Sequence, residues 1–98
     1  MKSERSLKIL ALERHAQLIR IMLILDSEGR INFQSFINDY SISSTTLYRT
    51  LEALRGLELV DSVVDRTSYP NQNVIFLTKR GKKVAEHLKE IEEVLEVA

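Results

Sequence analysis

The sequence predicts a mostly α-helical α+β domain with one small antiparallel β-hairpin. Apolar residues recur at helical spacing near both ends of the chain, over about 3–26 and 79–96. Shorter helical patterns lie between these two segments. A β-branched run, 57–65, and the apolar segment 73–77 flank a polar stretch that contains the single Pro, which is the pattern of a hairpin with a long loop.

Length and composition favour one domain, 1–98, with one core. The 98 residues include 14 Lys or Arg, 14 Asp or Glu and no Cys, and 44% of them are hydrophobic. Without Cys the chain has no disulfide and no Cys-based metal or catalytic site. No apolar stretch has the length of a signal peptide or the roughly 20 residues that cross a membrane. We therefore expect a soluble, cytoplasmic protein without a membrane partner.

The first predicted helix, 3–26, carries two apolar stripes on a helical wheel. One has the form of a core face: Leu7, Leu10, Ala11, Leu18, Ile21, Met22 and Leu25. The other points to nearly the opposite side: Leu12, Ile19 and Leu23. Because a surface helix of a monomer needs only one stripe, the second favours a homodimer. The alternative is that the terminal helices cover both stripes within one chain.

Short elements are expected next. Gly29 is a plausible left-handed cap for the first helix, and 30–31 could form one rung of a small sheet. Asn32 is a good N-cap for a short helix over 33–39. The apolar residues of that helix recur at helical spacing: Phe33, Phe36, Ile37 and Tyr40.

A helix predicted over 43–56 has one apolar and one polar face. The apolar face is formed by three leucines, Leu47, Leu51 and Leu54. The opposite face carries Thr45, Arg49, Glu52 and Gly56, with Thr46, Ala53 and Tyr48 beside it. Ser43 or Ser44 can cap the start of this helix, and Gly56 closes it.

The last helix begins after Thr78, a suitable N-cap, and occupies 79–96. Its apolar positions form a heptad-like seam of about two repeats: Val84, Leu88, Ile91 and Leu95. Paired with the outer stripe of the first helix, Leu88, Ile91 and Leu95 could complete a dimer interface. The seam could instead dock on the core of its own domain.

This order of elements, with these residues, resembles the winged helix-turn-helix fold. The resemblance rests on the paired short helices in RINFQSFINDYSISSTTLYRTLEALRGLELV, the hairpin DSVVDRTSYPNQNVIFL and the closing LTKRGKKVAEHL. The phrase Leu77-Thr78-x-x-Gly81 is similar to one in the MarR, PadR and related archaeal regulator families. The match covers about 18–88 and implies a small dimeric transcriptional regulator, with 3–26 and 79–96 as dimerisation helices.

The resemblance also implies which residues meet double-stranded DNA. The helix at 43–56 would be the recognition helix in the major groove, and the hairpin tip at 65–73 would be the wing, on the backbone or in the minor groove. The implied recognition-helix contacts are Ser43, Ser44, Thr45, Thr46, Tyr48 and Arg49. The implied wing contacts are Arg66, Thr67, Ser68, Tyr69, Asn71 and Gln72.

The chemistry of the 43–56 helix fits this assignment independently. Hydroxyl groups bond phosphates or base edges, and Arg49 could make a bidentate contact to guanine. Ser43 and Ser44 could instead serve only as caps. Tyr48 could either bond a phosphate or pack beside the hairpin. Glu52 is a caution, since it would repel a phosphate, although it could accept from the amino group of cytosine.

Charge is unevenly distributed. The densest basic patch is formed by Lys79, Arg80, Lys82 and Lys83, which are possible phosphate contacts or simply a solvated face. The segment 31–78 has three basic against five acidic side chains. Any DNA binding therefore depends on a few placed side chains and two-fold symmetry, to which the patch at 79–83 could add, and not on bulk charge.

Catalysis has almost no support in the sequence. His15 and His87 belong to no motif, and the chain has no glycine-rich phosphate loop and no nucleophile turn. We expect no catalytic residue, metal, cofactor or evident small-molecule ligand. The main alternative to DNA binding is a winged helix that serves as a protein–protein interaction module, which the zero net charge and Glu52 favour somewhat.

Overall fold

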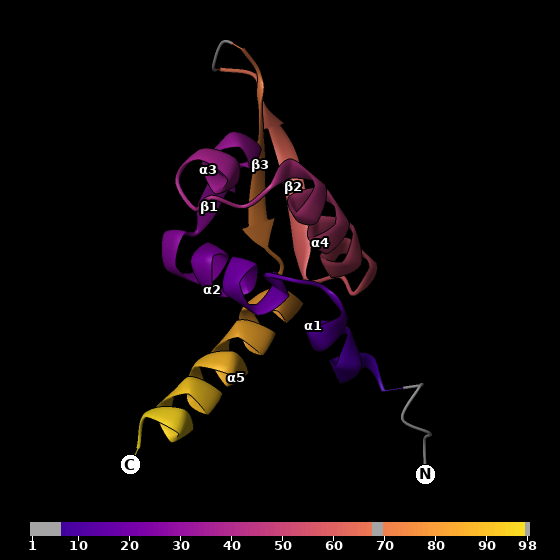
Figure 1. Ribbon diagram of the computed structural model, residues 1–98. Coiled ribbons are helices and arrows are strands. Elements are labelled where there is room, and N and C mark those ends of the chain that lie inside the picture. The colour runs from indigo at the N-terminus through magenta and orange to yellow at the C-terminus, as the bar shows by residue number, and fades with distance from the viewer. Residues whose placement is uncertain (1–6, 68–69, 98) are drawn as a thin grey trace.

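Helices α3 and α4 pack against one another beside a three-stranded sheet, and α5 leads away from them (Figure 1). The structure, a computed structural model, describes residues 7–67 and 70–97. A 3₁₀ helix, Lys8–Leu10, precedes the other elements. These are α1 (Ala11–Arg14), α2 (Leu18–Glu28), β1 (Arg30–Asn32), α3 (Phe33–Asn38), α4 (Ser44–Gly56), β2 (Val60–Asp65), β3 (Gln72–Leu77) and α5 (Lys79–Glu96). The predicted fold class is confirmed.

The helix starts are those predicted from side-chain caps. Each cap oxygen accepts the backbone N–H of the residue three positions on: Asn32 from Ser35 at 2.8 Å, Ser43 from Thr46 at 3.2 Å and Thr78 from Gly81 at 3.0 Å. Gly29 ends α2 with a φ of 83°, and its N–H donates to the carbonyl of Leu25 at 2.8 Å. Local sequence therefore determines these boundaries.

The end of α4 differs from the prediction. Gly56 is simply the last helical residue, and the left-handed residue is Glu58, with a φ of 61°. The Glu58 N–H donates to the Arg55 carbonyl at 2.9 Å, which turns the chain before it becomes extended. Strand β2 consequently begins at Val60 and not at Leu57.

The sheet has the strand order β1-β3-β2 and is antiparallel throughout. Ile31 of β1 pairs with Ile75 of β3, so the single rung expected at 30–31 is a three-residue strand. At the far end of the hairpin Asp65 pairs with Gln72, and six residues, 66–71, connect the two strands. The β2–β3 hairpin thus forms a long wing, and the short strand β1 pairs with its β3 strand.

The first predicted helix is not continuous, because the backbone leaves helical geometry at residues 15–17, between α1 and α2. Gln17 has a φ of 69°, which an α-helix cannot contain, and the Leu18 N–H donates to the His15 carbonyl at 3.3 Å. We call residues 7–14 the N-terminal arm and residues 15–17 the elbow. The break separates Leu12 from Ile19, so the two stripes of the wheel do not belong to one helix. Positions 3–6 lie outside the described residues.

The core stripe of α2 is confirmed, whereas that of the arm is not. Leu18, Ile21, Met22 and Leu25 are buried, but Leu7 is exposed, and Leu10 and Ala11 are only half-buried. The buried apolar residues form one cluster, to which α2, α3, α4, the sheet and α5 all contribute. The arm therefore lies at the margin of this core.

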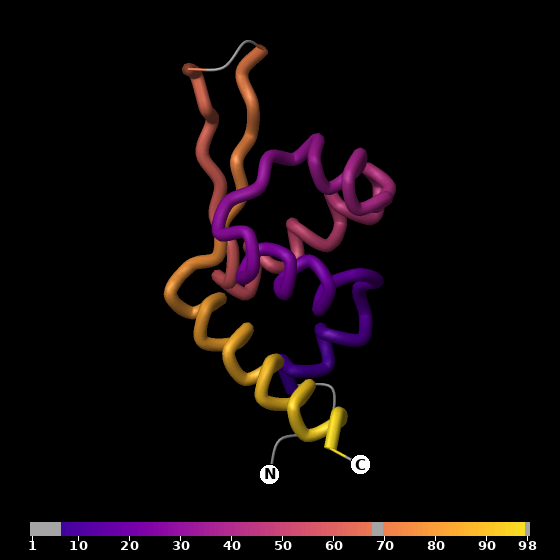
Figure 2. Tube along the Cα trace, turned by 90° about the vertical axis from the view of Figure 1, so that its left-hand side faces the viewer, coloured from indigo at the N-terminus to yellow at the C-terminus, as the bar shows by residue number. Residues whose placement is uncertain are grey.

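Helix α5 docks on the domain by its first half. Ala85 and Leu88 are buried in the common core, so Leu88, predicted for a dimer interface, belongs to its own domain instead. Gly81 is buried and packs directly on the backbone of Leu59. Farther along, the Lys89 ammonium pairs with the Asp26 carboxylate of α2 at 2.7 Å. Beyond this pair, the last turns of α5 extend away from the core (Figure 2).

Candidate nucleic-acid interface

The wing loop and the α3–α4 pair lie toward one end of the molecule, and the C-terminal end of α5 lies at the other (Figures 1 and 2). The described residues extend 50 × 32 × 25 Å along their principal axes. An elongated shape with a projecting hairpin beside a helix suits contact with an extended partner.

Helix α4 presents a polar face to solvent. Its buried residues are Leu47, Thr50, Leu51 and Leu54. Its exposed residues include Ser44, Thr45, Tyr48, Arg49, Glu52 and Arg55. The predicted division into a leucine face and a hydroxyl-and-arginine face is confirmed. The buried Thr50 was not anticipated, because a threonine within a helix gives no sign of burial by its type alone.

The first turn of α4 combines hydroxyl groups with free backbone N–H groups. Ser43 is the cap, and its Oγ both accepts from the Thr46 N–H and donates to Thr46 Oγ1 at 2.9 Å. Ser44 and Thr45 are exposed beside it. The N-terminus of a helix carries partial positive charge and favours anionic ligands. This turn can therefore receive a phosphate group, with Ser43 already engaged as the cap.

Tyr48 lies against α3. Its ring centroid is 4.7 Å from that of Phe33, with an angle of 44° between the rings, and the side chain is still 65% exposed. The ring of Tyr48 thus packs on α3, a neighbour that neither alternative, a phosphate contact or packing beside the hairpin, included. Such a contact limits the motion of the ring and leaves its outer parts in solvent.

Arg49 is exposed on the same face. Within the described part of the chain it has no hydrogen-bond or ion-pair partner. Arg55, near the end of the helix, instead donates to Ser62 Oγ of β2 at 3.0 Å and so ties α4 to the hairpin. Glu52 is exposed between these two arginines in the sequence. Arg49 is therefore the cation of α4 that is free to meet a ligand.

The wing loop has an ordered first turn. Asp65 Oδ1 accepts from both the backbone N–H of Thr67, at 3.0 Å, and its hydroxyl, at 2.6 Å. Arg66 and Asn71 are exposed. Ser68 and Tyr69, predicted as wing contacts, lie outside the described residues.

Gln72 is less available than predicted. It belongs to β3, is half-buried, and its side-chain oxygen accepts from the Asn32 amide at 3.2 Å. This bond ties the wing to β1. The side-chain amide nitrogen of Gln72 and the second lone pair of its oxygen are left for any contact at the wing tip.

The basic patch lies at the other end of the hairpin. The Arg80 guanidinium donates to Glu58 Oε2 at 3.0 Å and to the Leu57 carbonyl at 3.3 Å, beside the C-terminus of α4. A six-residue strand and a 13-residue helix are each roughly 20 Å long. The structure thus does not bring Lys79, Lys82 and Lys83 together with either the wing loop or the start of α4.

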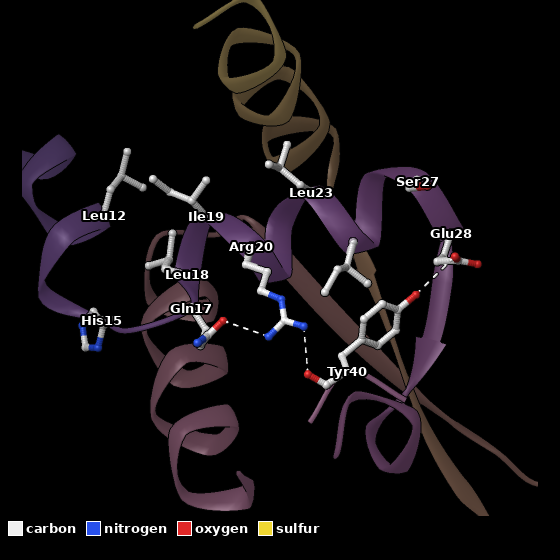
Figure 3. Close-up of a pocket in the computed structure, with 11 residues that line it drawn as sticks. Leu12, His15, Gln17, Leu18, Ile19, Arg20, Leu23, Ser27, Glu28 and Tyr40 are labelled. Carbon is white, nitrogen blue, oxygen red and sulfur yellow. Dashed lines mark hydrogen bonds between the residues drawn. The ribbon is translucent and has the colours of Figure 1, made fainter. Parts of the chain in front are cut away.

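Further apolar residues are accessible on the arm, on α2 and at the end of α5. A groove of about 690 Å³ runs along α2, where Leu12, Ile19 and Leu23 line it together with polar residues (Figure 3). Leu12 and Leu23 are partly buried against the core, and Ile19 is exposed. On α5, Ile91 is 53% and Leu95 is 74% exposed. The predicted dimer residues other than Leu88 thus keep at least part of their side chains accessible to a partner.

The pKa values of Tyr40 and Lys89 are raised, and both side chains have structural partners. Burial raises the pKa of the Tyr40 phenol, and the nearby Glu28 carboxylate, 3.3 Å from the phenol oxygen, raises it further. The hydrogen bond to Asp26 raises the pKa of Lys89. Neither group lies in a constellation for acid–base chemistry. Nor do the described residues bring together three or more His, Asp or Glu side chains that could hold a metal ion.

Across residues 7–67 and 70–97, no helix is both long and apolar enough to span a membrane.

Helices α2, α3 and α4 followed by the β2–β3 hairpin form a winged helix-turn-helix, and this fold is shared with solved structures of transcriptional regulators. A protein from Porphyromonas gingivalis W83 that is assigned to the MarR family superposes with a TM-score of 0.74 and 19% identity, over 100% of this chain and 98% of that one. YodB from B. subtilis, in its reduced form, superposes with a TM-score of 0.72 and 18% identity, over 95% of this chain and 90% of that one. A transcriptional regulator homologue from Pyrococcus horikoshii OT3 superposes with a TM-score of 0.71 and 18% identity, over 95% of this chain and 93% of that one.

No protein-family model matches the sequence, and no curated protein matches it significantly. The likeness to MarR-type regulators, predicted from the sequence, is confirmed at the level of the fold.

Proposed function

We propose that this chain is a sequence-specific, double-stranded DNA-binding transcriptional regulator that acts as a homodimer. The observation that carries the proposal is the exposed hydroxyl-and-arginine face of α4, in a fold shared with transcriptional regulators. In this role α4 is the recognition helix in the major groove, and the wing lies on the backbone or in the minor groove.

Base recognition in this proposal depends on Arg49. An exposed arginine without an internal partner is free to make the bidentate contact to the O6 and N7 atoms of guanine. Ser44, Thr45 and Thr46 would bond phosphates or base edges at the helix start, and Tyr48 would donate its hydroxyl to a phosphate. Ser43 would contribute mainly through its cap.

Backbone contact by the wing depends on Arg66. It is exposed beyond the end of β2, and Asn71 is an uncharged donor on the other side of the loop. Thr67 is engaged with Asp65, so its backbone and hydroxyl would help to shape the loop. We assign no DNA contact to Lys79, Arg80, Lys82 and Lys83, because they lie at the opposite end of the hairpin.

The homodimer would form through the arm and the last turns of α5. Large apolar side chains are exposed there without cover from the chain itself: Ile9, Ile19, Ile91, Val94 and Leu95. A two-fold axis through this surface would set two copies of α4 against a pseudo-palindrome, with half-sites about 34 Å apart.

Leu95→Glu should dissociate this dimer. The side chain is 74% exposed, so the change leaves the core intact but puts a carboxylate into an apolar interface. Light scattering should show dimeric wild type and monomeric Leu95→Glu at micromolar concentration. Val64→Glu, at an exposed apolar residue of the hairpin, is the matched control and should stay dimeric. A monomeric wild type would contradict the proposed interface.

Selection of bound duplexes from a random pool tests the proposal and separates it from its rival. A DNA-binding regulator should enrich a pseudo-palindromic sequence whose half-sites are one helical turn apart. A winged helix that binds only proteins should enrich none. The second candidate is favoured by the formal net charge of zero and by the exposed Glu52 on the reading face. If the chain is a protein-interaction module, it should form a stable complex with a protein partner that withstands purification.

A further inference from the structure

One polar side chain of α4 is buried behind the proposed reading face. Thr50 is 1% exposed and directly follows Arg49 in the sequence. Its hydroxyl donates to the carbonyl of Ala16 at 3.0 Å, across 34 positions of the chain. Ala16 lies in the elbow between α1 and α2 and not in a helix. The recognition helix is thus hydrogen-bonded directly to the point at which the N-terminal arm changes direction.

The elbow is held from a second side. Gln17 adopts a left-handed backbone conformation, which a residue with a side chain rarely takes unless its surroundings hold it there. The Arg20 guanidinium donates to Gln17 Oε1 at 3.1 Å and to the Tyr40 carbonyl at 2.9 Å, just beyond α3 (Figure 3). One bond to α4 and one bridge to the end of α3 therefore fix a strained turn of the backbone.

We propose that Thr50 is a positioning residue, which fixes the direction of the N-terminal arm relative to the recognition helix and so sets the half-site spacing that the dimer accepts. This inference rests on the proposed function. The arm carries part of the proposed dimer surface, including the exposed Ile9. When arm and α4 move as one body, the distance between the two copies of α4 is constant. Without the bond, the arm could turn at the elbow while each α4 stays on its half-site.

Two variants separate the hydroxyl from the shape of the side chain. Thr50→Val keeps the volume but leaves the Ala16 carbonyl without its donor, and Thr50→Ser keeps the donor. A purely structural role would lower stability alone. A positioning role predicts that Thr50→Val loses spacing selectivity while its affinity for a single half-site is unchanged, and that Thr50→Ser retains selectivity.

The first readout uses the duplex that wild type selects from a random pool, together with versions that gain or lose one base pair between the half-sites. Each such change rotates one half-site by about 34° and moves it by about 3.4 Å. Wild type and Thr50→Ser should prefer the selected spacing by about tenfold, a usual size for coupling between distant sites. Thr50→Val should prefer it by less than about threefold. Equal preference in wild type and Thr50→Val would overturn the inference.

The second readout needs no DNA. Because the sequence has no Cys, spin labels can be placed by Glu13→Cys on α1 and Glu52→Cys on α4, both exposed. With labelled chains diluted in unlabelled protein, the distance distribution within one chain should be narrow in wild type and Thr50→Ser, and broad in Thr50→Val. The same width in all three would overturn the inference. Thr50→Ala provides a second donor-free variant if Thr50→Val does not fold.

The two readouts distinguish the possible failures. If wild type selects no duplex, the proposed function fails, and the label distances still decide whether Thr50 fixes the arm. If wild type selects a duplex and Thr50→Val keeps its spacing preference, the inference alone fails.

Discussion

Gly81→Ala should lower the free energy of unfolding by roughly 3 kcal/mol, the upper part of the usual range for overpacking a core. A Cβ atom at this position would overlap the carbonyl oxygen of Leu59 and lie 3.2 Å from Leu77 Cδ2. The Leu59 carbonyl cannot move away easily, because it also accepts the Thr78 N–H at 3.0 Å. Docking of α5 on the domain therefore requires glycine in its first turn.

Thermal unfolding measures this effect. For a domain of this size, a loss of 1 kcal/mol lowers Tm by about 4–8 °C, so Gly81→Ala should melt more than about 10 °C below wild type. Gly56→Ala is the matched control, since Gly56 is also helical and nothing lies within 4 Å of its added Cβ. It should be neutral or stabilising by up to about 1 kcal/mol. Equal melting temperatures for the two variants would show that α5 does not pack on Leu59 in this way.

Arg49→Ala should weaken binding by about 10- to 100-fold for each half-site, since one bidentate arginine–guanine contact contributes about 1–3 kcal/mol of discrimination. Because the proposed dimer reads two half-sites, its affinity for the selected duplex should fall by about 100- to 10,000-fold. The loss should be greatest for the sequence with the recognised guanine and small for unrelated duplexes. Arg66→Ala should weaken binding to all duplexes by a similar factor and reduce the salt dependence of binding. A wing arginine on the DNA backbone contacts phosphates and reads no base.

Lys82→Ala is the matched control for both arginines. It removes the same unit of charge from an exposed position of α5, roughly 20 Å from the start of α4 and from the wing loop. Fluorescence anisotropy of labelled duplexes gives the affinities. If Lys82→Ala weakened binding as much as Arg49→Ala, the reading face would not be on α4.

Helix boundaries and the polar face of α4 could be predicted because they depend on neighbouring residues. Asn32, Ser43 and Thr78 cap helices through the backbone N–H three positions on, and helical spacing identifies the three leucines of α4. The phrase Leu77-Thr78-x-x-Gly81 was visible in the sequence as well. Its physical basis, a glycine against the Leu59 carbonyl, depends on a contact between distant segments and appears only in the fold.

The elbow could not be predicted for the same reason. Residues 15–17 contain neither Gly nor Pro, so the local pattern continues a helix through them. The break is stabilised by Thr50 from 34 positions away and by Arg20 against Tyr40. Because the wheel assumed one unbroken helix, it assigned Leu12 and Ile19 to one stripe. The burial of Leu88 could not be predicted either, since a heptad-like seam does not reveal which of its residues pack on the core of the same chain.

The salt dependence of duplex binding tests the central claim most directly. Wild type should bind its selected duplex at 50 mM salt, and the logarithm of the association constant should fall linearly with the logarithm of salt concentration, because phosphate contacts release counterions. Arg66→Ala should make this slope shallower by about two units, one for each copy in the dimer. Absence of binding to any duplex at 50 mM salt would contradict the claim that the α4 face and the wing form a DNA-binding surface.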